Sequence, residues 1–347
     1  MFKSKNIFKE VKRLALEVKV SAKDFFLSEH FGEYLSNTGE FMTSRYKRPI
    51  RIHMEHEPKN PTVAYTDGDM VYINGANPLS GFYKNLNQKF HCWLGIFFHE
   101  VGHILFLNFP KLHDALNAVN AGEWWPKAPD IEYLPLLEEI EEYQRKGAGP
   151  VLARIIGMLS NIIADVHDER AMMDKFGPLV EKALTTSSYA MQETSKNLED
   201  SVKDGMNDLS ILMGLILNYI RFDEVFMAKE DYENEHVKRL LSVIPFVDEG
   251  RDTDSMEERF ENINQIVLTI WPVIKEVLDK EEEKKEEKEK GEGGDESESG
   301  GDMKDSSSSS DSSSSGSGGD MESAIESILK ELGEVAGPTS TEVASGG

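Results

Sequence analysis

Residues 90–107 read FHCWLGIFFHEVGHILFL, and this stretch decides how the rest of the chain is interpreted. It contains an HExxH motif formed by His99, Glu100 and His103. On an α-helix, positions i and i+4 lie on one face, so both imidazoles can bind the same metal ion. The flanking residues are apolar, which predicts a buried helix over about 86–107. Two histidines and a glutamate are costly in a buried helix unless a cation or hydrogen bonds compensate them.

The motif predicts a zinc site with a general base beside it. A zinc ion held by His99 and His103 lowers the pKa of its water towards about 7, and Glu100 is then placed to accept the proton as a carbonyl group is attacked. The alternative is two hydrogen-bonded core histidines beside a neutralised carboxylate. We favour the metal site, because no other charged residue lies near the motif in the sequence.

A zinc site of this kind needs a third protein ligand. The extended HExxHxxGxxH form is absent, since Phe106 and Phe109 occupy the positions of its glycine and third histidine. A predicted helix over 151–176 carries an apolar stripe, and two acids one turn apart, Asp165 and Glu169, lie on or beside that stripe. We predict Asp165 as the third ligand.

Glu169 is then predicted to hydrogen-bond a ligand histidine. The roles of Asp165 and Glu169 remain exchangeable, and His167 is an alternative ligand. The competing interpretation is that these acids form ordinary surface pairs with Arg170 or Lys175.

The remaining pattern predicts a predominantly α-helical α+β fold. Residues 50–56 alternate in the manner of a strand, and in residues 63–74 the pair Asp67-Gly68 between two β-prone runs predicts a two-residue hairpin turn. Apolar periodicity and stop signals predict the helices, with Pro272 kinking the last. The predicted helical ranges are 1–48, shorter pieces within 111–150, 179–200, 206–228, 232–243 and 254–279.

Charge divides the chain into a body and a tail. The net charge is −25, and residues 279–320 hold 15 acidic and 6 basic side chains, so −9 belongs to this stretch and −16 to the remainder. Residues 280–320 are predicted to be an acidic, low-complexity, disordered linker, because a Ser/Gly/Asp tract cannot bury enough apolar surface to offset ordering. Residues 321–347 are predicted to hold a short amphipathic helix and a tail. The excess of acid argues against nucleic acid and anionic membranes as partners.

Three further features of the sequence bear on the cellular location of the protein. The single cysteine, Cys92, excludes an internal disulfide framework. The basic N-terminus has no apolar core of the signal-peptide kind, and the longest apolar stretch, Leu209–Ile220, is too short to span a bilayer. We therefore predict a cytoplasmic protein.

Several segments together resemble a known group of proteins. The helix motif HEVGHILF, the hairpin AYTDG…VYINGANPL, the segment NIIADVHDERAM and the stretch 257–278 are similar to a group of phage and bacterial zincin-like proteins. That group resembles the N-terminal region of the cobalt-chelatase T subunit and predicted metallopeptidases linked to von Willebrand A domains. The resemblance spans about residues 45–280. Where the family has an adjacent pair of acids, this chain has Ala164 and Asp165, and Glu169 also matches.

The resemblance implies a zincin-like domain over 1–178, with a small sheet over the HExxH helix, and a helical subdomain over 179–279 that completes the fold. It also implies a peptide or protein substrate, and for many relatives a MoxR-type AAA+ ring ATPase as partner. If the chain is phage-encoded, the host cytoplasm is the expected location.

Two functions follow from these observations. The first is a zinc metallopeptidase with Zn²⁺ on His99, His103 and Asp165 and with Glu100 as general base. The alternative is a non-catalytic, metal-stabilised adaptor that recruits a MoxR-type ATPase or a phage structural protein through its acidic tail. A cobalt-chelatase role is a weaker third option. For the oxyanion-stabilising donor, Tyr143, His167 and Tyr189 are equal candidates.

Overall fold

The computed structural model describes residues 20–44, 50–123, 134–222 and 233–292, together with Lys9 and residues 328–330 and 332. Within these ranges the chain is mostly helical and has one small mixed sheet of three strands. The fold class predicted from the sequence is confirmed at this level. Residues 124–133 and most of the predicted linker, residues 293–320, lie outside the described residues.

The sheet contains β1 (Arg51–Glu55), β2 (Ala64–Thr66) and β3 (Met70–Asn74) in the order β1-β3-β2. β1 is parallel to β3, and β2 is antiparallel to β3. The predicted hairpin joins β2 to β3, but Thr66 pairs with Val71, so the turn is longer than the two residues expected. The Thr66 hydroxyl donates to the Met70 carbonyl and accepts from the Gly68 N–H, which closes this wider turn with Gly68 at φ 96°.

The helix with the HExxH motif, α5 (Leu86–Phe106), begins where the Asn85 side chain accepts from the Asn87 N–H. Residues 90–104 are all buried, because the sheet, α8 and α9 pack around α5. At Gly95 the contact with α9 is so close that a Cβ atom would lie 2.2 Å from the Ala183 carbonyl oxygen. A glycine is therefore required for α5 to approach α9.

The other helices differ from the predicted ranges mainly at their ends. The predicted helix 179–200 is two helices, since Ser195 ends the first in an extended conformation and Asn197 caps the second. The last long helix runs on to Glu292, through the first part of the predicted linker 280–320. The elements are α2 (Ala22–Phe26), α3 (Glu29–Thr43), α4 (Pro78–Phe82), α6 (Phe109–Asn120), α7 (Leu134–Tyr143), η3 (Gln144–Ala148), α8 (Gly149–Phe176), α9 (Pro178–Thr194), α10 (Leu198–Lys203), α11 (Asp208–Phe222), α12 (Glu235–Asp252) and α13 (Met256–Glu292).

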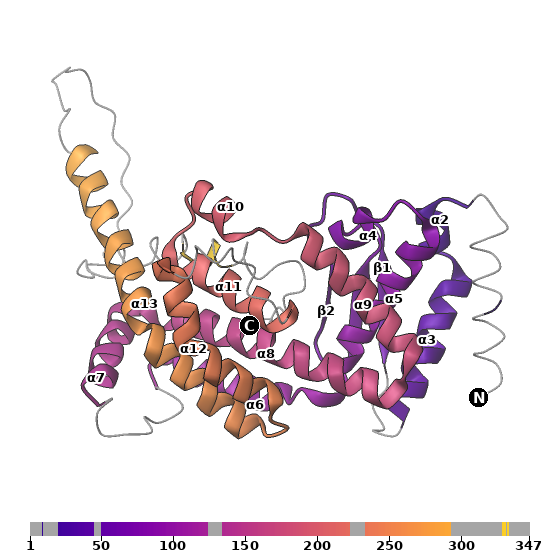
Figure 1. Ribbon diagram of the computed structural model, residues 1–347, viewed down its shortest axis with the longest axis horizontal. Helices are drawn as coiled ribbons and strands as arrows, with labels where there is room; N and C mark the ends of the chain where they lie inside the picture. The colour runs from indigo at the N-terminus through magenta and orange to yellow at the C-terminus, as the bar shows by residue number, and fades with distance from the viewer. Residues whose placement is uncertain are drawn as a thin grey trace, which may run out of the picture.

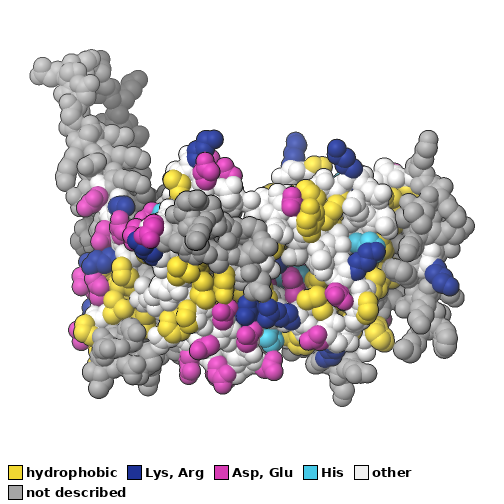
Figure 2. All heavy atoms as spheres, in the orientation of Figure 1, with side chains coloured by type: hydrophobic (Ala, Val, Ile, Leu, Met, Phe, Trp, Pro, Cys, Tyr) yellow, Lys and Arg dark blue, Asp and Glu magenta, His cyan; other side chains and the backbone are white. Residues whose placement is uncertain are grey.

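Two hydrophobic cores hold these elements, which lie in two neighbouring halves of the protein in Figure 1. The sheet-side core joins the sheet, α2–α5 and α9, and the helical-side core joins α6–α8 with α11–α13. Because α5 also packs against α8, these two helices form the seam between the cores. Acidic side chains gather over the helical half on the face shown in Figure 2, in line with the negative charge of the body.

One helical run in the described part of the chain, Leu134–Phe176, is long and apolar enough to cross a membrane by length and composition. The bent pair Leu86–Phe106 and Phe109–Asn120 passes the same test if it is taken together. Of the apolar window in Leu134–Phe176, 67% is buried inside the protein, as expected for a core helix.

Candidate metal centre

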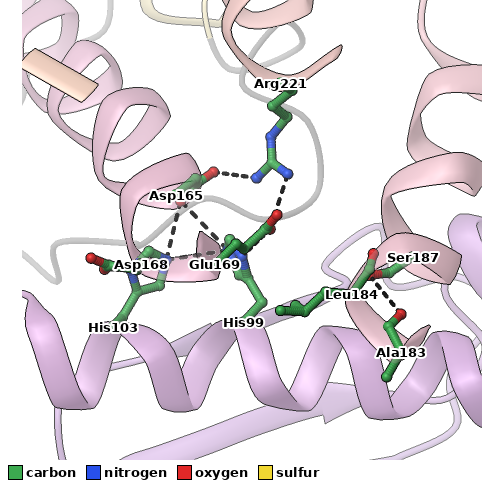
Figure 3. A network of polar contacts seen from close by, with 9 residues as sticks. All are labelled: His99, His103, Asp165, Asp168, Glu169, Ala183, Leu184, Ser187 and Arg221. Atoms are coloured by element: carbon green, nitrogen blue, oxygen red, sulfur yellow. Dashed lines mark hydrogen bonds and ion pairs between the residues drawn. The ribbon is translucent and has the colours of Figure 1, made fainter. Parts of the chain in front are cut away.

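Three buried side chains from α5 and α8 converge at the seam between the cores (Figure 3). His99 and His103 project from α5, one turn apart, and Asp165 faces them from α8. The Nε2 atoms of the two histidines are 3.2 Å apart, and the Asp165 Oδ1 atom lies 3.5 Å from His99 Nε2 and 3.2 Å from His103 Nε2. The structure thus brings together the three residues predicted as ligands.

Two carboxylates on α8 hold the outer nitrogen of each histidine. His99 Nδ1 lies 2.8 Å from Glu169 Oε1, and His103 Nδ1 lies 3.1 Å from Asp168 Oδ2. A carboxylate accepts from each Nδ1–H, and this assigns both Nε2 atoms as lone-pair acceptors. The predicted role of Glu169 matches this contact.

The resulting arrangement fits a cation, and without one its polar atoms lack hydrogen-bond partners. Two Nε2 lone pairs cannot hydrogen-bond each other, and the buried Asp165 Oδ1 has no hydrogen-bond partner. A tetrahedral zinc site with bonds of about 2.0–2.1 Å places neighbouring ligand atoms about 3.3–3.4 Å apart. The three observed separations, 3.2, 3.2 and 3.5 Å, match that spacing.

Arg221 of α11 fixes the acids of α8 from the opposite side (Figure 3). Its guanidinium donates from Nη2 to Asp165 Oδ2 and from Nη1 to Glu169 Oε1, the latter at 3.2 Å. Burial alone would raise the pKa of Asp165, but Arg221 and the two histidines hold it well below its usual range. Asp165 is therefore ionised, with Oδ2 held by Arg221 and Oδ1 directed at the histidines.

The charges around the site leave an excess of acid. The carboxylates of Asp165, Asp168 and Glu169 face two buried guanidinium groups, on Arg221 and Arg259. With both histidines neutral, one negative charge remains in a region that excludes water, and ionisation of Glu100 would add a second. A divalent cation would neutralise them.

Glu100, the predicted base, is 3% exposed and belongs to the same electrostatic cluster. Burial raises its pKa, His99 and His103 lower it, and the charge of Asp165 raises it again. Among the described residues, no hydrogen bond or ion pair reaches its carboxylate. Its buried environment therefore makes Glu100 hold a proton more readily than an exposed glutamate does, which suits a group that accepts and returns a proton.

His167 does not join the metal ligands. Its Nδ1 lies 3.0 Å from Asp168 Oδ1, and its Nε2 lies 2.9 Å from Asp254 Oδ1 at the surface. Both ring nitrogens of His167 contact carboxylates outside the group of three, so the structure does not bring His167 to these residues. His167 instead continues a chain of contacts from His103 through Asp168 to the connection between α12 and α13.

Sequence reasoning missed two residues of the site, Asp168 and Arg221. Asp168 lies three positions after Asp165, so the signal was an acid on the same inward helical face. Arg221 ends a strongly apolar helix, and a lone cation there is a signal for a buried partner. The two tyrosines considered as oxyanion donors are held elsewhere. Tyr143 donates to Asp279, and Tyr189 packs edge-on against Phe82.

Comparison of the chain with protein-family models, with curated proteins and with solved structures gave no match.

Proposed function

We propose that this protein is a zinc-dependent peptidase of the zincin-like type that its sequence resembles. The observation that carries the proposal is the convergence of two imidazole nitrogens and one carboxylate oxygen, with an unpaired glutamate next to the first histidine. Three protein ligands leave a fourth position of a tetrahedral ion open, which distinguishes catalytic zinc sites from structural ones.

Zinc in this position would polarise a substrate carbonyl and acidify a water molecule. The protein's own groups do the remaining work. Glu169 and Asp168 orient the imidazoles, Arg221 holds Asp165 ionised, and Glu100 accepts and returns the proton that peptide hydrolysis transfers to the leaving amine.

The burial of the site sets a condition on this function. His99 is 6% exposed and Asp165 only 2%, so a peptide reaches the centre only after neighbouring segments move aside. We therefore expect slow turnover by the isolated chain, and a ring ATPase is a natural class of partner to drive such an opening.

The decisive experiment compares Glu100→Gln with the unchanged protein. We expect about one zinc per chain in both proteins by elemental analysis. Hydrolysis of a quenched-fluorescent peptide library should fall roughly 100-fold or more in Glu100→Gln, because only the base is lost. Glu181→Gln, an exposed change on α9, is the matched control and should leave both quantities unchanged.

Two results would overturn the proposal. If the purified protein contains no metal and takes up none when zinc is added, the proposed zinc site is refuted. If Glu100→Gln and the unchanged protein hydrolyse the peptides equally fast, the assignment of Glu100 as general base is refuted, whereas the metal site is not.

The burial of the site favours one second candidate, a metal-stabilised adaptor without catalytic activity. In this function the ion joins the two cores, and the acidic tail binds a MoxR-type ATPase or a phage structural protein. Zinc-dependent partner binding that survives Glu100→Gln, together with no hydrolysis by either protein, would select the adaptor.

A further inference from the structure

Asp168 of α8 has one imidazole on each of its two carboxylate oxygens. Its Oδ2 atom lies 3.1 Å from His103 Nδ1, and its Oδ1 atom lies 3.0 Å from His167 Nδ1. An ionised carboxylate only accepts hydrogen bonds, so each of these Nδ1 atoms carries the hydrogen. Asp168 is 1% exposed, so little solvent reaches either contact. The carboxylate that orients His103 is therefore itself oriented by His167.

The carboxylate that orients the other ligand histidine is held in the same way (Figure 3). Glu169 Oε1 lies 2.8 Å from His99 Nδ1, and Arg221 Nη1 donates to the same oxygen at 3.2 Å. Each ligand histidine thus has a carboxylate behind it, and each carboxylate accepts from a further N–H donor. Arg221 is this donor on the His99 side, and His167 is its equivalent on the His103 side.

A competing cation lies close to Asp168. Arg259 of α13 is 4% exposed, and the charge of Asp168 opposes the lowering of the Arg259 pKa that burial causes. Arg259 Nη2 donates to the Thr253 carbonyl at 3.1 Å, but its Nε atom has no hydrogen-bond partner among the described residues. Without a donor on Oδ1, the carboxylate of Asp168 would be free to turn towards this guanidinium and away from His103. The contact with His167 opposes that rotation.

We propose that His167 is a positioning residue of the metal centre, which acts through Asp168 to hold the His103 imidazole in the orientation that binds the ion. The inference rests on the zinc site of the proposed function and is independent of peptide hydrolysis, because the peptidase and the adaptor need the same site. Only the Nδ1 side of the His167 ring takes part. Its Nε2 atom lies 2.9 Å from Asp254, whose side chain is fully exposed, and such a pair contributes little.

Two amide side chains separate the two sides of the His167 ring. In His167→Asn the amide nitrogen takes the position of Nδ1 and can still donate to Asp168. In His167→Gln the amide nitrogen takes the position of Nε2, so the contact with Asp254 is kept and the contact with Asp168 is lost. If the ring only filled space, the opposite order would follow, because asparagine is smaller than glutamine and leaves the larger gap.

The experiment measures zinc affinity by competition with a chromophoric chelator, and the visible absorption of the protein loaded with cobalt(II). We expect His167→Gln to weaken zinc binding about tenfold, the low end of the range for residues that orient metal ligands, and to alter the cobalt spectrum. His167→Asn should bind zinc within about threefold of the unchanged protein and keep its spectrum. Asp254→Asn, the exposed control, should match the unchanged protein. Thermal unfolding with chelator checks that each variant is folded.

A double variant tests the route through Asp168. Asp168→Asn removes the charged acceptor that both imidazoles share. If His167 acts only through this carboxylate, adding His167→Gln to Asp168→Asn should weaken zinc binding no further.

Three results would overturn the inference. They are an unchanged zinc affinity in His167→Gln, an equal loss of affinity in His167→Asn and His167→Gln, and a further loss in the double variant. Each of them leaves the proposed function standing, because the unchanged protein still binds zinc. If the unchanged protein binds no zinc, the proposed function and this inference are both refuted.

Discussion

Asp165→Asn is the substitution that tests the metal centre most directly. Asp165 uses Oδ2 to accept from Arg221 and directs Oδ1 at two imidazole nitrogens. An asparagine keeps one oxygen for Arg221 and places its NH₂ group where Oδ1 was. That group is a hydrogen-bond donor, and it would donate to His103 Nε2, 3.2 Å away, at the point where a cation would bind.

The change therefore exchanges an ion site for a neutral hydrogen-bonded one. We expect Asp165→Asn to fold with nearly the stability of the metal-free protein and to lose the stabilisation that zinc provides. For free zinc at 1,000 times the dissociation constant, that stabilisation is about 4 kcal/mol. In a folded region of this size, 1 kcal/mol corresponds to about 2–4 °C, so zinc should raise the Tm of the unchanged protein by roughly 8–16 °C.

The assay is thermal unfolding with buffered free zinc and with a chelator, applied to both proteins. Asp174→Asn, an exposed change on the same helix, is the matched control and should keep the full zinc-dependent shift. An equal zinc-dependent shift in Asp165→Asn would refute the assignment of Asp165 as a ligand. A Tm of the unchanged protein that is insensitive to zinc would refute the site.

Three other substitutions test the surroundings of the site. Arg221→Met should lower the free energy of unfolding by about 3–5 kcal/mol in denaturant titrations with chelator, because Asp165 and Glu169 lose their buried partner. The control is Arg170→Met, which removes an exposed pair with Asp252 and should lower the free energy of unfolding by under about 1 kcal/mol. Asp168→Asn should weaken zinc binding about 10–100-fold in a chelator competition, since His103 loses the carboxylate that orients it, and unchanged affinity would contradict that role. Gly95→Ala should destabilise the protein by about 1–3 kcal/mol because the new Cβ meets the Ala183 carbonyl, whereas Gly157→Ala, with ordinary contacts at 3.7 Å, should not.

The ligand set could be predicted from sequence because it depends on short-range spacing. His99 and His103 share a face by helical periodicity alone, and Asp165 stood out as an acid on an apolar stripe. The sequence also predicted that Glu169 hydrogen-bonds a ligand histidine, since such a histidine needs an acceptor for its outer nitrogen. The sequence did not predict that this histidine is His99 rather than His103.

The missed features all depend on contacts between distant segments. Arg221 follows Asp165 by 56 positions and meets it only because α11 packs on α8. His167 is an alternative ligand by sequence because it lies between Asp165 and Glu169, and only the path of the α12–α13 connection brings Asp254 to its ring. The hairpin turn was mispredicted for a related reason. Asp-Gly favours a two-residue turn locally, but the pairing of Thr66 with Val71 sets a wider one.

The position of the site at the seam between two cores links its chemistry to the stability of the protein. His99 and His103 belong to a helix whose apolar neighbours lie mostly in the sheet-side core, whereas Asp165 and Arg221 come from helices of the other core. Without a cation, the Nε2 lone pairs of His99 and His103 face the ionised Oδ1 of Asp165. Protons must then lie between these three atoms. Asp165 and Asp168 accordingly raise the pKa of His103 well above its usual value although burial opposes this. A bound divalent ion would replace those protons with bonds that cross the seam, so under the proposed function metal binding would also strengthen the contact between the two halves.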